Sequence, residues 1–153
     1  MDVSFDTCLV FNTRMAARAM TRFHDGRLRP YGVTSAQFSL LGGIRRGEGK
    51  SVSELAEQNG IDRTSLTRNL DRLEKMGLVV SRSAGQGTPR ICDLTDAGEA
   101  MVEKLAPVWV AAQDELRDLL SSGDFSTTLN VLKRLSRIER TGAAAPKNPG
   151  GQQ

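Results

Sequence analysis

Residues 51–77, SVSELAEQNGIDRTSLTRNLDRLEKMG, contain two short helical patterns that are separated by one turn. Ser51 and Glu54 have the spacing of a capping box, which starts the first helix, and Gly60 is placed to end it. The second pattern covers about 62–76 and carries leucines at helical spacing on one face. Two short helices joined by a tight turn that contains glycine are typical of a helix-turn-helix.

The outer face of the second helix is polar and basic. With Leu66 taken as the inward direction and about 100° of rotation per residue, the outward and flanking positions can be assigned. Arginine binds guanine O6 and N7 with two hydrogen bonds, and hydroxyl groups contact base edges or phosphates, so this face suits a DNA major groove. The alternative is a helix decorated for solubility. The outward and flanking residues are Arg63, Thr64, Ser65, Thr67, Arg68, Asp71, Arg72 and Lys75.

Within this set we expect different roles at the two ends of the helix. Arg63 and Arg68 are predicted to read bases. Arg72 and Lys75 lie farther along, where a helix in the groove rises toward the backbone, and are predicted to contact phosphates. Asp62 is expected to cap the helix. The residues predicted to contact DNA from this helix are Arg63, Thr64, Ser65, Thr67, Arg68, Arg72 and Lys75.

A β-hairpin is predicted directly after the second helix. Residues 78–82 and 90–94 have the character of two short strands, and residues 83–89 between them are rich in turn formers. A hairpin that follows a helix-turn-helix is a wing. Arg82 and Arg90 flank its loop and are predicted to reach a narrow minor groove or its phosphates.

Ser51 and Ser53 lie at the start of the first short helix. Free backbone amides and the helix dipole favour a phosphate there, so both serines are candidate DNA contacts. Simple capping of the helix by Ser51 explains its position equally well.

Further helical patterns lie on both sides of this region. A long first helix over about 5–28 ends before Pro30. Thr34 and Gln37 can form a capping box for a second helix, which is stopped at Gly47–Gly49. After the hairpin, residues 95–140 form a long helix, in which Pro107 is expected to cause a kink, and a final shorter helix that begins after residues 121–124. The tail 141–153 is small and polar and is predicted to be disordered. We expect one domain over residues 1–140, mostly α-helical with a small hairpin.

Positive charge is concentrated in the middle of the chain. Residues 29–92 carry ten lysines and arginines against six acidic residues, whereas residues 1–28 carry four against three and residues 93–153 carry seven against nine. A basic middle segment suits a domain whose centre meets a polyanion while its ends meet protein. A solvated surface with uneven charge is the alternative.

Composition excludes several other classes of protein. The chain has 153 residues, and no apolar run is long enough to cross a bilayer. The first residues are acidic and lack the features of a secretion signal, so we expect a cytoplasmic protein. Cys8 and Cys92 lie far apart and do not suggest a zinc or disulfide framework. His24 is the only histidine and no phosphate-binding glycine loop is present, so neither an enzyme nor a cofactor or metal site is expected.

The motifs together resemble the MarR family (multiple antibiotic resistance regulators). The resemblance rests on SVSELA from Ser51, TSLTRNLDRLEKMGLV from Thr64 and LTDAG from Leu94. It implies a winged helix-turn-helix over about 30–94, with residues 5–28 and 95–140 supplying dimerisation helices from both ends of the chain. It also implies a homodimer on a pseudo-palindromic operator, usually a repressor, released by a small-molecule effector or an oxidant. The wing departs from the family, since Gln86–Thr88 replaces an acidic residue and arginines near its tip.

Two further regions are candidate sensors. Cys8 lies where the peroxide-sensing branch of the family places a reactive cysteine, but no tyrosines accompany it, and an inert cysteine is the alternative. Cys92 is expected to pack in the wing, and His24 to lie on the surface or in a dimer contact. A cavity for an apolar or aromatic effector is the other candidate, with ordinary core packing as its alternative. Its predicted lining residues are Met15, Met20, Phe23 and Trp109.

We therefore predict a DNA-binding transcriptional regulator, whose partners are double-stranded DNA, a second copy of the chain and a small-molecule effector, with no membrane partner. A redox-responsive regulator that acts through Cys8 is one alternative. The other is a helical interaction module that keeps the fold without reading DNA, and weak, salt-insensitive association with every duplex would identify it.

Overall fold

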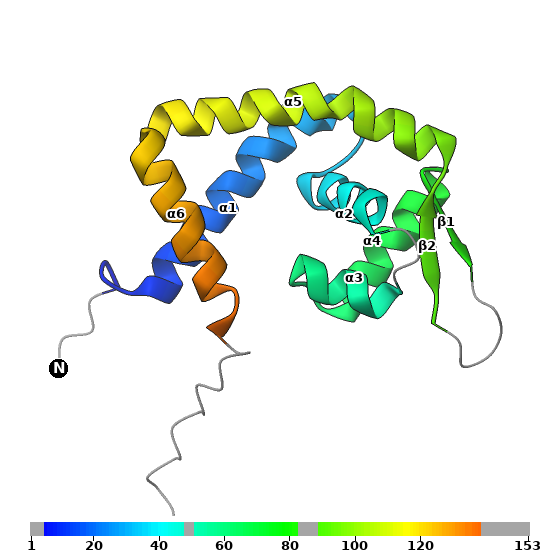
Figure 1. Cartoon of the computed structure of the whole chain (residues 1–153), viewed down its shortest axis with the longest axis horizontal. Helices are drawn as coiled ribbons and strands as arrows, with labels where there is room; N and C mark the ends of the chain where they lie inside the picture. Colours follow the sequence, from blue (N-terminus) through cyan, green and yellow to red (C-terminus); the bar gives the residue numbers. More distant parts are fainter. Residues whose placement is uncertain (1–4, 48–50, 83–88, 139–153) are drawn as a thin grey trace, which may run out of the picture. The chain divides into compact units, whose positions relative to one another are not determined.

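The computed structural model describes residues 5–47, 51–82 and 89–138. The chain divides into two compact units, Met1–Ala112 and Gln113–Gln153. The predicted class is confirmed, because α-helices dominate and one antiparallel hairpin follows the fourth of them (Figure 1). In chain order the elements are α1 (Leu9–Leu28), the 3-10 helix η1 (Arg29–Tyr31), α2 (Ser35–Arg46), α3 (Val52–Asn59), α4 (Arg63–Lys75), β1 (Val79–Arg82), β2 (Ile91–Leu94), α5 (Asp96–Leu120) and α6 (Ser122–Leu135).

The boundaries of the three central helices follow from their capping residues. Thr34 and Gln37 form a capping box at the start of α2, and Ser51 and Glu54 form another at the start of α3. Each box satisfies two backbone amides that the helix itself leaves without partners. Gly60 ends α3 in the left-handed conformation, at φ 62°, which costs glycine least. These boundaries are as predicted.

Two details at the helix termini differ from the sequence-based expectation. Cys8 is the N-cap residue of α1 and does not lie inside the helix, which begins at Leu9. The final helix begins earlier than expected, at Ser122, because the Ser121 side chain caps it by accepting from the amide of Asp124. Helix α5 continues through Pro107, and the tail 141–153 lies outside the described residues.

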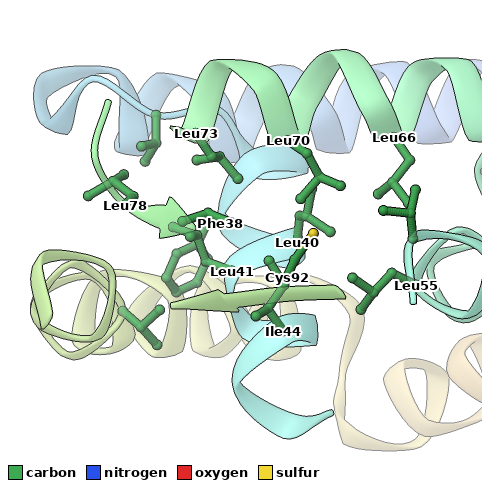
Figure 2. Packing of buried hydrophobic residues seen from close by; sticks show 14 of the residues in the cluster. Phe38, Leu40, Leu41, Ile44, Leu55, Leu66, Leu70, Leu73, Leu78 and Cys92 are labelled. Carbon is green, nitrogen blue, oxygen red and sulfur yellow. The ribbon is translucent and has the colours of Figure 1, made fainter. Parts of the chain in front are cut away.

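A leucine core joins the helix-turn-helix to the hairpin. Leu66, Leu70 and Leu73 of α4 are fully buried, and Figure 2 shows them descending from one side of that helix toward α2 and the sheet. Their spacing of three and four residues places them on one face, as predicted. Burying each such side chain contributes about 1.5–3 kcal/mol. The other core side chains labelled in this view are Phe38, Leu40, Leu41, Ile44, Leu55, Leu78 and Cys92.

Helix α5 is anchored to the end of α4 by a short motif. The Thr95 hydroxyl donates to the carbonyl of Gly77 at 2.6 Å and accepts from the amide of Gly98 at 3.1 Å. The Thr95 amide donates to the carbonyl of Leu78 at 3.2 Å. A Cβ at Gly98 would clash with that same Leu78 carbonyl oxygen, so only glycine lets α5 approach the chain this closely. The LTDAG motif is thus a packing motif.

None of the helices in the described part of the chain has the length and apolar character that a membrane span requires.

Candidate nucleic-acid interface

Helix α4 presents its polar face outward because its leucines occupy the inner one. Asp62 caps the helix, accepting from the amide of Ser65 at 2.8 Å. The hydrogen bonds from Ser65 hold the pKa of Asp62 below its ordinary value, so the cap is ionised at neutral pH. The expected capping role of Asp62 is therefore present in the structure.

Five residues of this helix line one shallow, open hollow on its outer surface. It includes both arginines that are predicted to read bases, two threonines and one carboxylate. Arg63, Thr64 and Arg68 are exposed, and Thr67 is half-buried, its hydroxyl donating to the carbonyl of Arg63 at 2.8 Å. The lining residues are Arg63, Thr64, Thr67, Arg68 and Asp71.

The basic side chains of α4 keep their charges available for a ligand. Arg63, Arg68, Arg72 and Lys75 are all exposed, and none of them forms an ion pair with another residue in the described ranges. Four unpaired cations along a helix of thirteen residues create a local positive potential. Such a surface attracts the phosphate backbone of a nucleic acid.

The two serines before and within α3 differ in their surroundings. The Ser51 hydroxyl donates to the Glu54 carboxylate at 2.7 Å, and the amide of Val52 donates to the carbonyl of Arg90 at 2.9 Å. The first turn of α3 is thus occupied by its own cap and by the wing strand. Ser53 is exposed. A phosphate contact remains a prediction for both serines, and the capping role of Ser51 is the one that the geometry supports.

The two wing arginines are both paired with carboxylates. Arg82 forms an ion pair with Asp93 across the hairpin, while its side chain stays 73% exposed. Arg90 donates to Glu74 at 2.7 Å and to Asp71 at 3.2 Å, both on α4. Contact between Arg90 and a minor groove would require it to leave these partners, so the structure does not favour that predicted role. Gln86–Thr88 lies outside the described residues.

Sequence reasoning missed the acidic partners of Arg90. Glu74 is half-buried, and although burial raises its pKa, the hydrogen bonds from Ser81 and Arg90 lower it below the ordinary value. The same interactions with Glu74 and Asp71 raise the pKa of Arg90 against the effect of burial. No local signal predicts this cluster, because Arg90 follows Asp71 by 19 residues and Glu74 by 16.

The residues predicted to line an effector cavity lie in two different environments. Phe23 and Trp109 both contact His24, with ring centroids 5.3 and 4.6 Å away. Met15 and Met20 are instead exposed on α1, by 49% and 42%. The set therefore splits into a packed aromatic cluster and an exposed apolar surface.

The expectation of a surface position for His24 is wrong. Its residue is only 5% exposed, because Nδ1 hydrogen-bonds the carbonyl of Met20 at 2.9 Å and the ring packs against Phe23 and Trp109. Phe38 extends the cluster, with its ring centroid 5.3 Å from that of Trp109. A buried imidazole is tolerated because neither of its nitrogens is buried without a hydrogen-bond partner.

The two cysteines have different environments. Cys8 is partly exposed, and Cys92 is buried in the core, as expected for a packing residue. Burial raises the pKa of the Cys92 thiol, which also lies 3.4 Å from the Ser81 hydroxyl. Within the described residues, no group of three or more histidine, cysteine or carboxylate side chains could hold a metal ion.

Several known proteins are similar to this chain. The crystal structure of the transcriptional regulator MosR from M. tuberculosis is 34% identical, covers 90% of this chain and 99% of its own, and has a TM-score of 0.79. The same regulator in complex with DNA is 33% identical, with the same coverage and TM-score. A mutant MarR from E. coli complexed with operator DNA is 26% identical over 88% of this chain and 99% of its own, with a TM-score of 0.76.

Sequence relatives agree with these structures. An uncharacterised HTH-type transcriptional regulator of Bacillus cereus is 33% identical over 91 residues, which are 60% of this chain and 60% of that protein. The alignment thus spans less than two thirds of that relative. A model of the MarR family matches residues 31–87, which include α2, α3, α4 and β1. The helix-turn-helix, the wing and the likeness to MosR along nearly its whole length lead to one assignment: this chain is a member of the MarR family.

Proposed function

We propose that this protein is a transcriptional regulator that binds DNA in a sequence-specific manner. The single observation that carries the proposal is the outer face of α4, where Arg63 and Arg68 are exposed and unpaired beside Thr64 and Thr67. Helix α4 follows the turn of the helix-turn-helix, which is the position of a recognition helix. MosR and the E. coli MarR mutant, both similar to this chain, have been crystallised with DNA.

The chemistry of α4 divides into base reading and backbone contact. The guanidinium groups of Arg63 and Arg68 can donate two hydrogen bonds each to guanine, and the threonine hydroxyls can donate or accept at base edges. Arg72 and Lys75 at the other end of the helix neutralise phosphates. Arg82, whose side chain projects from the wing, adds a phosphate contact despite its ion pair with Asp93.

The regulator acts as a homodimer. Large apolar side chains on α1 are 41–66% exposed, and three on α6 are 40–42% exposed. Exposed apolar surfaces of this kind mark sites of interaction with other proteins. A second copy of the chain would cover both surfaces, and its two-fold symmetry matches a palindromic operator. The exposed residues are Leu9, Val10, Phe11, Met15 and Met20 of α1, and Leu129, Val131 and Leu132 of α6.

The dimer represses transcription by occupying an operator in the cytoplasm, and a small-molecule effector releases it. Release requires only that the effector change the separation or tilt of the two recognition helices, because a dimer that cannot reach both half-sites loses most of its specific affinity. The aromatic cluster of Phe23, His24, Phe38 and Trp109 connects α1 and α5 to α2 of the DNA-binding part. Repacking of this cluster would transmit such a change.

Selection of genomic DNA fragments by the purified full-length chain, followed by footprinting of the winning fragment over a salt series, tests the proposal. We expect a protected pseudo-palindrome with half-sites about 10 base pairs apart and a steep loss of affinity with salt. An Arg63→Ala, Arg68→Ala double variant should enrich no site while retaining its fold. If the wild type binds every duplex weakly and without salt dependence, the proposed regulator is rejected in favour of a helical interaction module.

A further inference from the structure

Arg90 ties the wing to the recognition helix through two carboxylates. Its Nη2 atom lies 2.7 Å from Oε2 of Glu74, and Nη1 and Nη2 each lie 3.2 Å from Oδ1 of Asp71. Ser81 on β1 also hydrogen-bonds Glu74. Both strands of the hairpin are therefore connected to α4 at this cluster. Hydrogen bonds between ionised partners are stronger than those between neutral ones, so they restrain the side chains that they join.

Asp71 differs from Glu74 in where its carboxylate lies. Glu74 has 29% of its side chain exposed and serves mainly as an anchor, whereas Asp71 is 50% exposed. Asp71 also lines the hollow on α4 together with Arg63, Thr64, Thr67 and Arg68. The surface that meets the DNA bases thus contains one carboxylate, and Arg90 holds one of its oxygens.

A carboxylate at this position is costly for general DNA affinity but useful for selection. Phosphates repel it, and so do the acceptor atoms of guanine and thymine in the major groove. The amino groups of cytosine N4 and adenine N6 are donors, but the N7 acceptor beside adenine N6 repels a carboxylate, so Asp accepts best from cytosine. Arg90 offsets part of the charge and keeps the carboxylate from turning toward the other cations of α4. An acid on a helix that faces DNA therefore lowers general affinity but increases the difference in affinity between cytosine and the other bases.

We propose that Asp71 is a specificity-determining residue that accepts a hydrogen bond from a cytosine amino group, and that Arg90 is a positioning residue which orients it and does not contact DNA. This inference rests on the proposed function, since it names a base that the DNA-reading surface selects. It assigns Arg90 to the contact between the wing and α4, and adds Asp71 to the residues that read bases.

The test is selection from a random duplex library by the full-length wild type and by Asp71→Ala. The wild type should show a cytosine preference in each half-site, and Asp71→Ala should lower that preference roughly 5- to 150-fold while binding random DNA at least as tightly. Asp96→Ala removes one exposed acid from the start of α5 and is the matched control, expected to keep the cytosine preference.

The role of Arg90 is tested by the salt dependence of binding. Arg90→Ala should lower the preference for cytosine at the same position of the site. It should not change the slope of log affinity against log salt concentration, because no phosphate contact is lost. If Arg90→Ala alone folds poorly, the double variant Glu74→Ala, Arg90→Ala takes its place, because it leaves no unpaired anchor carboxylate at Glu74. We expect the double variant to lose the cytosine preference and keep the salt slope. A slope reduced by about 1 with the cytosine preference intact would show instead that Arg90 binds phosphate.

The outcomes separate this inference from the proposed function. If the wild type selects a site and Asp71→Ala selects the identical one, Asp71 does not read a base, and the regulator stands without it. If the wild type selects no sequence at all, the proposed function and this inference both fail.

Discussion

Gly98 shows how one residue without a side chain can set the position of a whole helix. A Cβ there would clash with the backbone oxygen of Leu78, and backbone cannot move aside as a flexible side chain can. The neighbouring Thr95 hydroxyl donates to one carbonyl and accepts from the Gly98 amide, so the contact is also fixed by hydrogen bonds. The glycine of the LTDAG motif is explained by close packing and not by a turn.

Gly98→Ala should therefore lower the free energy of unfolding by about 1–3 kcal/mol, the usual cost of overpacking. Gly42→Ala in α2 is the matched control, because a Cβ there meets nothing within 4 Å. Alanine favours a helix over glycine, so the control should be neutral or more stable by up to about 1 kcal/mol. Chemical denaturation measures the free energy of unfolding of both variants. Equal stabilities of Gly98→Ala and Gly42→Ala would contradict the packing argument.

Arg68 and Lys75 should respond differently to removal. Arg68 lines the hollow on α4, so Arg68→Ala should cost about 1–3 kcal/mol on the operator and relax selectivity at particular bases. Lys75 lies in the last turn, so Lys75→Ala should weaken binding to all sequences alike. Titration of operator and random duplexes with each variant measures the difference. Equal losses on the two duplexes would defeat the base-reading role of Arg68.

At the scale of elements, the helix boundaries depend on a few capping side chains. Thr34 accepts from the amide of Gln37 at 3.2 Å, and the Gln37 side chain accepts from the amide of Thr34 at 2.9 Å. Thr34→Ala should lower stability by about 1 kcal/mol, since α2 then starts with unsatisfied amides. Ser39→Ala on the exposed side of α2 should change little. Thermal unfolding of the two variants compares them, and no difference would mean that the cap is dispensable.

The attachment of the hairpin to α4 should weaken in acid. The pKa of Glu74 is lower in the folded chain than in the unfolded one, so its contribution is complete above the unfolded pKa of about 4.5 and is lost as the pH falls through the folded value. The wild type should lose stability below about pH 5, and Glu74→Gln should lose less over the same range. Urea unfolding between pH 7 and 3 tests this, with Glu103→Gln, 70% exposed, as the control. Parallel curves for wild type and Glu74→Gln would contradict it.

For the whole molecule, the proposed homodimer is the feature to test. Leu132 on α6 is 40% exposed among other apolar residues. A leucine buried at a two-fold interface contributes twice, so Leu132→Asp should weaken dimerisation by at least about 3–6 kcal/mol. Analytical ultracentrifugation should find this variant monomeric at concentrations where the wild type and Ser39→Asp are dimeric. A wild type that sediments as a monomer would remove the homodimer from the proposed function.

The sequence alone determined the local features of this protein. Capping boxes at Thr34 and Ser51, the glycine end of α3 and the leucine face of α4 are predictable because each depends on residues within one or two helical turns. The polar outer face of α4 followed from the same periodicity. Even the departures at Cys8 and Ser122 shift a boundary by a few residues and leave the element in place.

Only the tertiary structure decided which long-range partners each side chain meets. Arg90 looks like a free wing arginine in the sequence, yet it joins Asp71 and Glu74 because the hairpin folds back onto α4. His24 looks like a surface histidine, yet Trp109 of a distant helix covers it. Burial and ion pairing depend on the packing of whole elements, and no local pattern encodes how residues far apart in the chain approach each other.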